Sequence, residues 1–186
     1  MPSLSRADHR TSPPLLDIPR DYNAAHDLIG RNLEAGRGAK LAYIDDAGSY
    51  TYDVLEARSN RVANALRALG VGREERILLC MLDTFDLPCV FLGAIKAGIV
   101  PVLVNTLLTV ADYEFMLADS RARIAIVSAP LAAAIAPALE RVATFEQMIV
   151  AGADAAEHPR LDVLLETAAP VAEIAPTVAD EPCFWL

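Results

Sequence analysis

The sequence predicts an α/β fold in which a parallel β-sheet is flanked by helices. Continuous apolar runs are typical of strands buried on both faces, and strands that alternate with helices pair in parallel through right-handed crossovers. Four such runs alternate with helical patterns here, at residues 76–82, 99–104, 123–128 and 147–152. With 54% hydrophobic residues and a mean hydropathy of +0.31, the chain is not disordered, and 186 residues suffice for one domain with a sizeable core.

The N-terminal region is predicted to contain an arm, a helix and a hairpin. Residues 1–20 hold four prolines among many polar groups, which favours a mobile arm, so we place the start of the domain at residue 21. The run KLAYIDDAGSYTY (residues 40–52) predicts a β-hairpin in which Gly48 supplies a positive φ. A helix is predicted over residues 22–33, with a buried face of Ala25, Leu28, Ile29 and Leu33.

Capping signals place the ends of the following helices. Thr51 is expected to cap a helix that ends before Gly70, a residue suited to the left-handed conformation after a helix, with Val71 as its apolar contact. The buried face of that helix is predicted to be Leu55, Val62, Leu66 and Leu69. Asp83 or Thr84 is expected to cap a helix that runs to about residue 97.

The second half of the chain continues the pattern and then changes character. Thr109 opens a capping-box-like TVAD sequence and a helix to about residue 120, and an Ala-rich helix is expected over residues 130–141. Residues 152–182 contain four prolines and one short helical pattern, RLDVLLETA, which indicates a surface excursion. The final run, CFWL, has the apolar character of a buried strand.

Composition argues against several classes of function. The net charge is −9 and the basic residues are scattered, whereas nucleic-acid binding requires clustered Lys and Arg. An odd number of cysteines in apolar runs, Cys80, Cys89 and Cys183, is typical of reduced intracellular thiols, and we expect a cytoplasmic protein. The three histidines have no metal-ligand spacing, so we expect no metal site built by these residues.

No secretory signal or membrane-spanning helix is expected. The N-terminus lacks an apolar segment of the kind that secretory signals contain. Residues 87–110 carry a single charge and are long enough to span a bilayer. However, Gly98 followed by Pro101 divides this stretch, so we predict a helix, a turn and a strand in a protein core.

Two motifs that resemble functional sites have a structural explanation. GAIKAG (residues 93–98) has two glycines, but Ile99 and Val100 stand where a phosphate loop needs Lys and Ser or Thr, so helix capping and close packing are predicted. Asp45 and Asp46 lie in a hairpin turn, where Asp is a frequent turn residue.

Polar residues after two strands are better candidates for ligand binding. Asp83 follows a buried strand at its carboxyl end, where open α/β sheets bind ligands, although helix capping alone would explain it. The segment VNTLLT offers Asn105, Thr106 and Thr109 at the carboxyl end of a second strand and beside a helix N-terminus, a favourable place for an anion. No arrangement of residues indicates a nucleophile or a general base, so no catalytic residue is assigned.

Three segments resemble the N-terminal part of the acyl- and aryl-CoA synthetases of the adenylate-forming superfamily: SYTYDVLEARSNRVANALRALGVGREERILLCMLDT, FLGAIKAGIVPVLVNTLLT and YEFMLADSRARIAIVS. Within that superfamily, AYIDDAGSYTY, VNTLLT and DEPCFWL are most similar to the benzoate-CoA ligases and their hydroxybenzoate relatives. The resemblance runs from about residue 22 to residue 186. It implies that residues 21–186 form an incomplete N-terminal domain of an adenylate-forming enzyme. In the family, a phosphate loop follows the strand that corresponds to CFWL, and this chain is truncated before that loop.

The resemblance also implies a reaction and its cofactors. Enzymes of this family use ATP and Mg²⁺ to convert a carboxylic acid, here an aromatic acid such as benzoate, to an acyl-adenylate, and then transfer the acyl group to CoA. The loop that corresponds to VNTLLT lies on the CoA side in relatives, which assigns Asn105, Thr106 and Thr109 to CoA. The phosphate loop, the ribose-binding aspartate and the catalytic lysine of the family match no position here, so this chain alone is expected to be inactive without the C-terminal remainder.

Two alternatives remain open at this stage. One is a CoA ligase for another acid, such as a hydroxybenzoate, a hydroxycinnamate or a fatty acid. The other is a non-catalytic α/β module, against which an exposed Phe-Trp-Leu terminus argues, because exposed apolar edges promote aggregation. The sequence does not indicate an oligomeric state.

Overall fold

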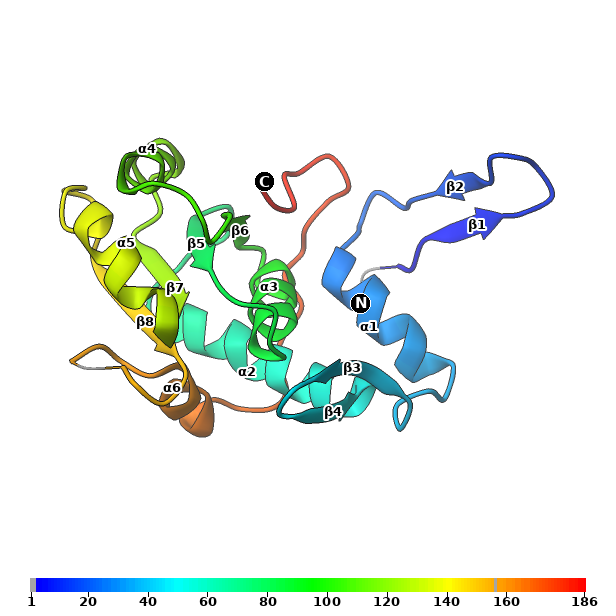
Figure 1. Cartoon of the computed structure of the whole chain (residues 1–186). Helices are drawn as coiled ribbons and strands as arrows, with labels where there is room; N and C mark the ends of the chain where they lie inside the picture. The colour runs from blue at the N-terminus through cyan, green and yellow to red at the C-terminus, as the bar shows by residue number, and fades with distance from the viewer. Residues whose placement is uncertain (1–2, 156) are drawn as a thin grey trace.

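A computed structural model describes residues 3–155 and 157–186 and contains a parallel four-stranded sheet with helices on both faces (Figure 1). The strands lie in the order β6-β5-β7-β8, and every neighbouring pair is parallel. The predicted α/β class is therefore confirmed. The strands are β5 (Arg76–Cys80), β6 (Val100–Leu103), β7 (Ile124–Ser128) and β8 (Gln147–Ala151).

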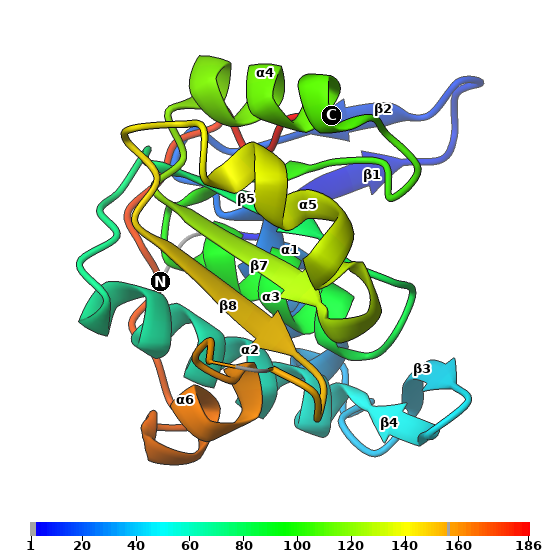
Figure 2. The same ribbon diagram turned by 60° about the vertical axis from the view of Figure 1, so that its left-hand side comes forward.

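Alternate residues of the strands pack into separate cores on the two faces of the sheet. In β5, Ile77 and Leu79 belong to the core beneath α2, α3 and α6, whereas Leu78 and Cys80 belong to the core beneath α4 and α5. Figure 2 shows the sheet between these two helical layers. The helices are α2 (Tyr52–Ala68), α3 (Asp86–Lys96), α4 (Val110–Ser120), α5 (Ala132–Leu139) and α6 (Leu161–Thr167).

A third, smaller core joins the N-terminal elements to α3. It contains Ile29, Leu55, Phe85 and Cys89, against which tyrosines of a hairpin pack. This hairpin confirms the one predicted over residues 40–52. The elements that precede α2 are β1 (Arg6–Asp8), β2 (Leu15–Asp17), α1 (Ala24–Glu34), β3 (Leu41–Asp45) and β4 (Gly48–Thr51).

Local capping signals fix the start of α2, the start of α4 and the end of α2 as the sequence predicts. Thr51 accepts a hydrogen bond from the Val54 N–H, and Thr109 forms a complete capping box with Asp112. Gly70 has a φ of 76° after α2. A short 3₁₀ turn, Ala129–Leu131, precedes α5 within the predicted Ala-rich helix.

The stretch at residues 87–110 forms the predicted helix, turn and strand, namely α3 and β6. At Gly93 a Cβ atom would lie 2.6 Å from the Val62 Cβ, so the glycine permits close packing of α3 on α2. Gly98 has a φ of 77° after α3. The packing and capping explanation of GAIKAG is therefore confirmed. In the part of the chain that the structure describes, no helix has both the length and the apolar character needed to span a bilayer.

Three local predictions are wrong, and in two of them a contact distant in sequence replaces the local one. Leu28 is 60% exposed, while Asp27, one position earlier, is buried by hydrogen bonds with Ser5, Tyr22 and Arg31. Gly48 is not among the residues with positive φ. The third error concerns the start of α3, where Phe85 and not Asp83 or Thr84 occupies the N-cap position.

In the hairpin turn, the side chain of Asp45 takes the role predicted for Gly48. Its Oδ1 atom accepts hydrogen bonds from the Ala47 N–H at 2.9 Å and from the Gly48 N–H at 3.0 Å. These bonds close the turn without a left-handed residue.

The two ends of the chain adopt structure that the sequence only partly indicated. β1 and β2 form an antiparallel hairpin within the region predicted as a mobile arm, whose mobility stays a prediction. At the other end, Trp185 bridges Val102 in parallel, and its N–H donates to the Pro101 carbonyl at 3.0 Å. The final residues therefore lie along the outer edge of β6.

Candidate functional site

A crevice lies outside the carboxyl ends of β5, β7 and β8. From β5 the chain first adds β6 on one side and then crosses to add β7 on the other side, so the strand order reverses at β5. In open α/β sheets, ligands bind in the crevice at such a reversal. The crevice is open to solvent and measures about 1290 Å³.

A hydrogen bond joins two strand ends at the floor of the crevice. The Leu82 N–H, just beyond β5, donates to the Ser128 hydroxyl at the end of β7 over 2.9 Å. Ser128 is buried. The bond ties together the two strands between which the order reverses.

The β3–β4 hairpin forms one wall of the crevice through Asp45. Its Oδ2 atom accepts a 2.8 Å hydrogen bond from the Phe85 N–H at the start of α3. Phe85 is the N-cap residue, and neither Asp83 nor Thr84 caps the helix, so that prediction is wrong. The backbone N–H groups, with Phe85 first and then Ala47 and Gly48, hold the pKa of Asp45 below its usual value.

An aromatic pair supports the same wall. The rings of Tyr50 and Phe85 stack with centroids 3.8 Å apart and planes at 2°. Desolvation and the nearby charge of Asp45 raise the pKa of the Tyr50 hydroxyl, which therefore stays protonated at neutral pH.

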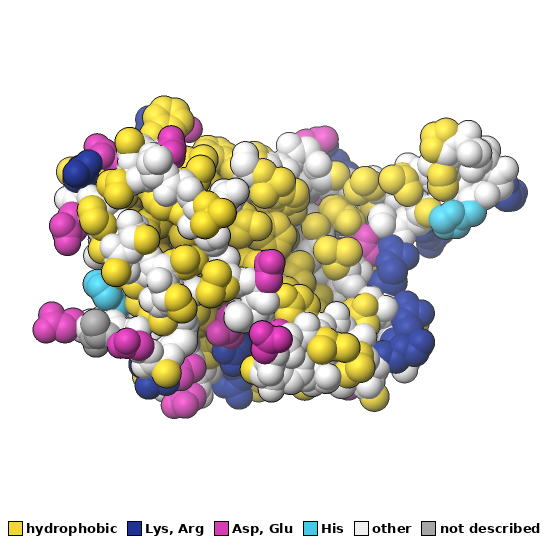
Figure 3. Space-filling model, in the orientation of Figure 1, with side chains coloured by type: hydrophobic (Ala, Val, Ile, Leu, Met, Phe, Trp, Pro, Cys, Tyr) yellow, Lys and Arg dark blue, Asp and Glu magenta, His cyan; other side chains and the backbone are white. Residues whose placement is uncertain are grey.

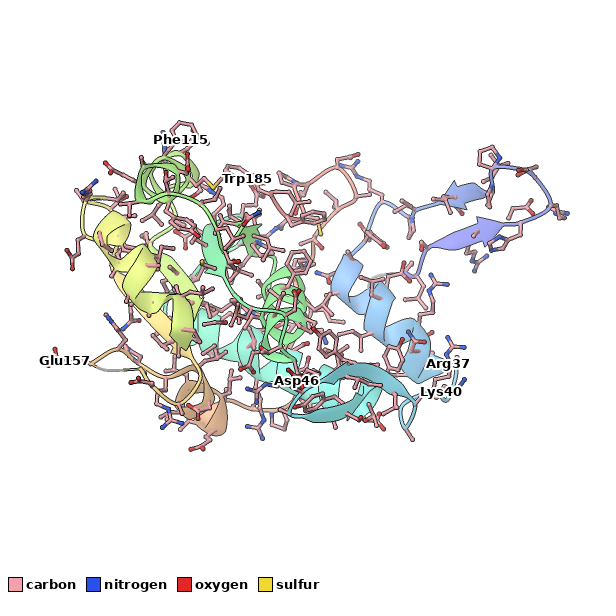
Figure 4. All side chains as sticks on the ribbon, viewed as in Figure 1. Arg37, Lys40, Asp46, Phe115, Glu157 and Trp185 are labelled. Atoms are coloured by element: carbon pink, nitrogen blue, oxygen red, sulfur yellow. The ribbon has the colours of Figure 1, made fainter. Side chains whose placement is uncertain are left out.

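The charged residues of the crevice are mostly acidic. Arg58 of α2 donates from its Nε atom to Asp86 at 3.0 Å, so its charge is paired. Asp46 lies at the end of the hairpin that faces the sheet (Figure 4), and acidic side chains stand beside hydrophobic ones on this face of the molecule (Figure 3). The lining carboxylates are Asp45, Asp46, Asp53, Asp83, Asp86 and Asp154.

The described residues that line the crevice include hydroxyl groups but no paired nucleophile and base. No His or Cys is among the described residues that line it. Cys80 and Cys89 are buried elsewhere, and desolvation raises the pKa of both thiols. Among residues 3–155 and 157–186, no group of three His, Cys, Asp or Glu side chains is placed to hold a metal ion.

The predicted loop at residues 105–109 lies after β6, on the other side of β5 from β7, and none of its three candidates lines the crevice. The Asn105 Oδ1 atom accepts a hydrogen bond from the Leu107 N–H at 2.8 Å. This bond uses the side-chain oxygen of Asn105 and not its NH₂ group. The Thr109 hydroxyl is engaged in the capping box with Asp112. Asn105 is exposed and Thr106 is half-buried.

The structure adds site residues that the sequence did not indicate. Asp83 lines the crevice as its position suggested, and Ser128 and Arg58 lie there with it. Ser128 could have been found, because it is a polar residue at the carboxyl end of an apolar strand, like Asn105. Arg58 lies on a helix without a distinguishing motif, and only the packing of α2 against α3 places it here.

Comparison with protein families supports the similarity suggested by the motifs. The family model described as AMP-binding enzyme matches residues 31–186. The chain belongs to this AMP-binding enzyme family. The matched region includes the sheet, the β3–β4 hairpin and both candidate sites.

Two curated members of the AMP-binding family share much of the sequence. The benzoate–CoA ligase of Thauera aromatica is 55% identical over the whole of this chain, which covers 35% of that protein. A 4-hydroxybenzoate–CoA/benzoate–CoA ligase of Rhodopseudomonas palustris is 42% identical over 89% of this chain and 31% of its own length. The chain thus spans about a third of the length of these relatives.

Solved structures of the family share the fold. A benzoate CoA ligase from Burkholderia xenovorans LB400 superposes with a TM-score of 0.82 at 49% identity, over 89% of this chain and 32% of that one. The anthranilate CoA ligase AuaEII superposes with a TM-score of 0.84 at 30% identity, over 90% of this chain and 31% of that one. The sheet and its flanking helices therefore correspond to the N-terminal part of adenylate-forming enzymes.

Proposed function

We propose that the chain is part of an AMP-forming acid–thiol ligase that activates benzoate and transfers it to CoA. The observation that carries this proposal is the 55% identity to the Thauera benzoate–CoA ligase along the entire chain. We further propose that residues 21–186 belong to the N-terminal domain of this ligase, and that the enzyme acts in the cytoplasm, where ATP and CoA are available.

The proposed reaction has two steps. A carboxylate oxygen of benzoate attacks the α-phosphorus of ATP, the bond to the bridging oxygen breaks, and pyrophosphate leaves. The sulfur of CoA then attacks the carbonyl carbon of the adenylate, AMP leaves with the electron pair of the C–O bond, and the thiol proton passes to solvent. Mg²⁺ would neutralise phosphate charge in the first step. No catalytic role is assigned to the described residues, and this part of the enzyme contributes to binding and orientation.

Within this reaction we assign Asn105, Thr106 and Thr109 to the side on which CoA approaches. The free amide donor of Asn105 and the hydroxyl of Thr106 suit polar groups of the CoA arm, whereas Thr109 would act by holding α4 in place. In the longer protein, Asn105→Ala should raise KM for CoA and leave pyrophosphate release without CoA unchanged. Loss of both activities would contradict this assignment.

The substrate is tested with the longer protein and a series of acids. Benzoate, hydroxybenzoates, a hydroxycinnamate and a fatty acid are each supplied with ATP and Mg²⁺, and pyrophosphate release and thioester formation are measured. We expect the highest kcat/KM for benzoate. If another acid gives the highest kcat/KM, that acid replaces benzoate as the substrate and the proposed reaction stands. If no acid leads to pyrophosphate release, both the substrate and the reaction are overturned. The 186-residue chain alone is expected to form no thioester.

A further inference from the structure

The β1–β2 hairpin stands away from the body of the molecule (Figures 1 and 3), and hydrogen bonds hold its base. The carboxylate of Asp27 in α1 accepts hydrogen bonds from the Ser5 hydroxyl before β1 at 2.5 Å and from the Tyr22 hydroxyl after β2 at 2.9 Å. Arg31 donates to the other oxygen of Asp27 at 2.6 Å and to the Ser5 carbonyl. Both strands of the hairpin are thus fixed to one helix at their base.

Further contacts fix the return strand to the C-terminal segment. Arg20 and Asp180 form an ion pair of 2.5 Å, and the Ala179 N–H donates to the Arg20 carbonyl at 2.9 Å. Desolvation raises the pKa of Asp27, but the hydrogen bonds from Ser5, Arg31 and Tyr22 outweigh it and the net pKa is lowered. The root is therefore charged and ordered at neutral pH, which sets the direction of the hairpin.

Beyond this root the hairpin exposes apolar side chains and two open edges. Leu15 is 63% exposed and Leu16 is 70% exposed. Within the described residues, neither β1 nor β2 pairs with a third strand. An isolated two-stranded hairpin is marginally stable in water, and an open edge is a template for pairing with another chain.

The outer edge of β1 is complementary to itself. Its sequence is Arg6-Ala7-Asp8, with a small residue between opposite charges. If two copies pair antiparallel about Ala7, Arg6 of each copy lies opposite Asp8 of the other. Opposite charges in directly facing positions stabilise a strand pair, and the two-fold symmetry doubles the effect. Asp8 also holds Arg10, but a carboxylate can accept from both arginines.

The same pairing places Leu16 of both copies on one apolar face. Leu16 is the cross-strand neighbour of Ala7 and lies on the same side of the hairpin. A sheet in the order β2-β1-β1-β2 would present a continuous row of Leu16, Ala7, Ala7 and Leu16. Pairing through β2 instead would place Leu15 opposite Asp17, an apolar group against a charge. We propose that the β1 edge is a dimerisation surface whose partner is a second copy of this protein.

Cysteine cross-linking tests the pairing in the full chain, with Cys183→Ser as background because Cys80 and Cys89 are buried. A disulfide needs Cα atoms within about 7 Å, and residues directly opposite in an antiparallel pair lie about 5 Å apart. Leu16 would lie about 14 Å from its counterpart, three strand spacings away. Under mild oxidation, Ala7→Cys should therefore give at least about tenfold more disulfide dimer than Leu16→Cys. Equal or greater cross-linking by Leu16→Cys, or none by Ala7→Cys, would overturn the proposal.

Sedimentation of the chain without added cysteines tests the charge pairing. Arg6→Glu places like charges opposite each other twice per dimer and should raise the dimer Kd by about tenfold. Arg37→Glu makes the same charge change in the turn after α1, away from the hairpin (Figure 4), and should leave Kd unchanged. A chain that stays monomeric at all concentrations, or association that Arg6→Glu does not weaken, would refute a dimer through β1.

Discussion

The ammonium group of Lys96 lies 2.6 Å from a carboxylate oxygen of Glu56 and 2.8 Å from the side-chain oxygen of Asn60, between α3 and α2. The Lys96 side chain is 2% exposed, whereas that of Glu56 is 28% exposed. Desolvation lowers the pKa of Lys96, and Glu56 opposes this shift. The ion pair therefore stabilises the buried Lys96 charge in the contact between α2 and α3.

Removal of the carboxylate should destabilise the chain and change its pH dependence. Glu56→Gln leaves the Lys96 charge without its partner and should lower the free energy of unfolding by up to about 3 kcal/mol at neutral pH. The folded-state pKa of this base is below its unfolded value of 10.5, so the unfolded chain binds more protons between the two values. The free energy of unfolding should therefore rise with pH between these two pKa values. In Glu56→Gln the folded-state pKa of Lys96 should be lower still, so the rise should begin at a lower pH.

Urea unfolding at several pH values measures this effect. The control is the double variant Glu56→Gln/Lys96→Met, which carries neither charge and should recover most of the lost stability. If Glu56→Gln has the same pH slope as the unchanged chain, then Lys96 does not carry the predicted charge.

Gly93 should be intolerant of a side chain. A Cβ atom would lie 2.6 Å from the Val62 Cβ and 2.7 Å from the Ser59 carbonyl oxygen, so Gly93→Ala should separate α3 from α2 and cost about 1–3 kcal/mol. At Gly72 the nearest atom, a Glu75 carboxylate oxygen, would lie 3.6 Å away. Gly72→Ala is therefore the matched control, and thermal or urea unfolding compares the two. Equal stabilities would contradict the packing role of Gly93.

The hydrogen bond between Leu82 and Ser128 should support the floor of the crevice. Ser128→Ala leaves the Leu82 N–H without its acceptor and should cost about 1–3 kcal/mol. Hydrogen exchange at the Leu82 amide should accelerate beyond the change in global stability. Ser49→Ala, an exposed serine of β4, serves as control and should change neither quantity. Unaltered exchange at Leu82 in Ser128→Ala would mean that this bond does not hold the two strand ends.

Sequence patterns predicted the features that depend on neighbouring residues. The caps at Thr51 and Thr109 and the glycine after α2 rest on contacts within a few positions, so composition and spacing indicate them. The hydrogen bond from the Phe85 N–H to the Asp45 carboxylate joins residues 40 positions apart and replaces the cap expected from Asp83 or Thr84. No local pattern contains that information.

The positions of the candidate sites also depend on information that local sequence patterns do not contain. Asp83 and Asn105 follow adjacent strands and were both predicted near the carboxyl edge of the sheet, as observed. Only the strand order separates them, because the crossover after β6 returns past β5 and places β7 on its other side. The crevice therefore forms beside Asp83 and Ser128 and away from Asn105.

The segment after α6, predicted as a surface excursion, is bound along α2 by a row of polar side chains. Asn64 donates to the carbonyls of Ala169 and Val171, each at 2.9 Å, and Asn60 donates to the Pro170 carbonyl at 2.9 Å. Arg67 donates to the Glu173 carbonyl at 2.8 Å. These helix residues donate to an extended backbone that pairs with no strand among the described residues.

Asn64→Ala should release this segment locally. Two carbonyls lose their donor, so hydrogen exchange over residues 168–173 and its cleavage by a protease should both accelerate, with a loss of global stability of about 1 kcal/mol. Asn32→Ala is the matched control, because Asn32 donates within its own helix to the Leu28 carbonyl. It should leave residues 168–173 unchanged. If the segment remains equally protected in Asn64→Ala, its position depends on apolar packing against the core and not on the row of donors along α2.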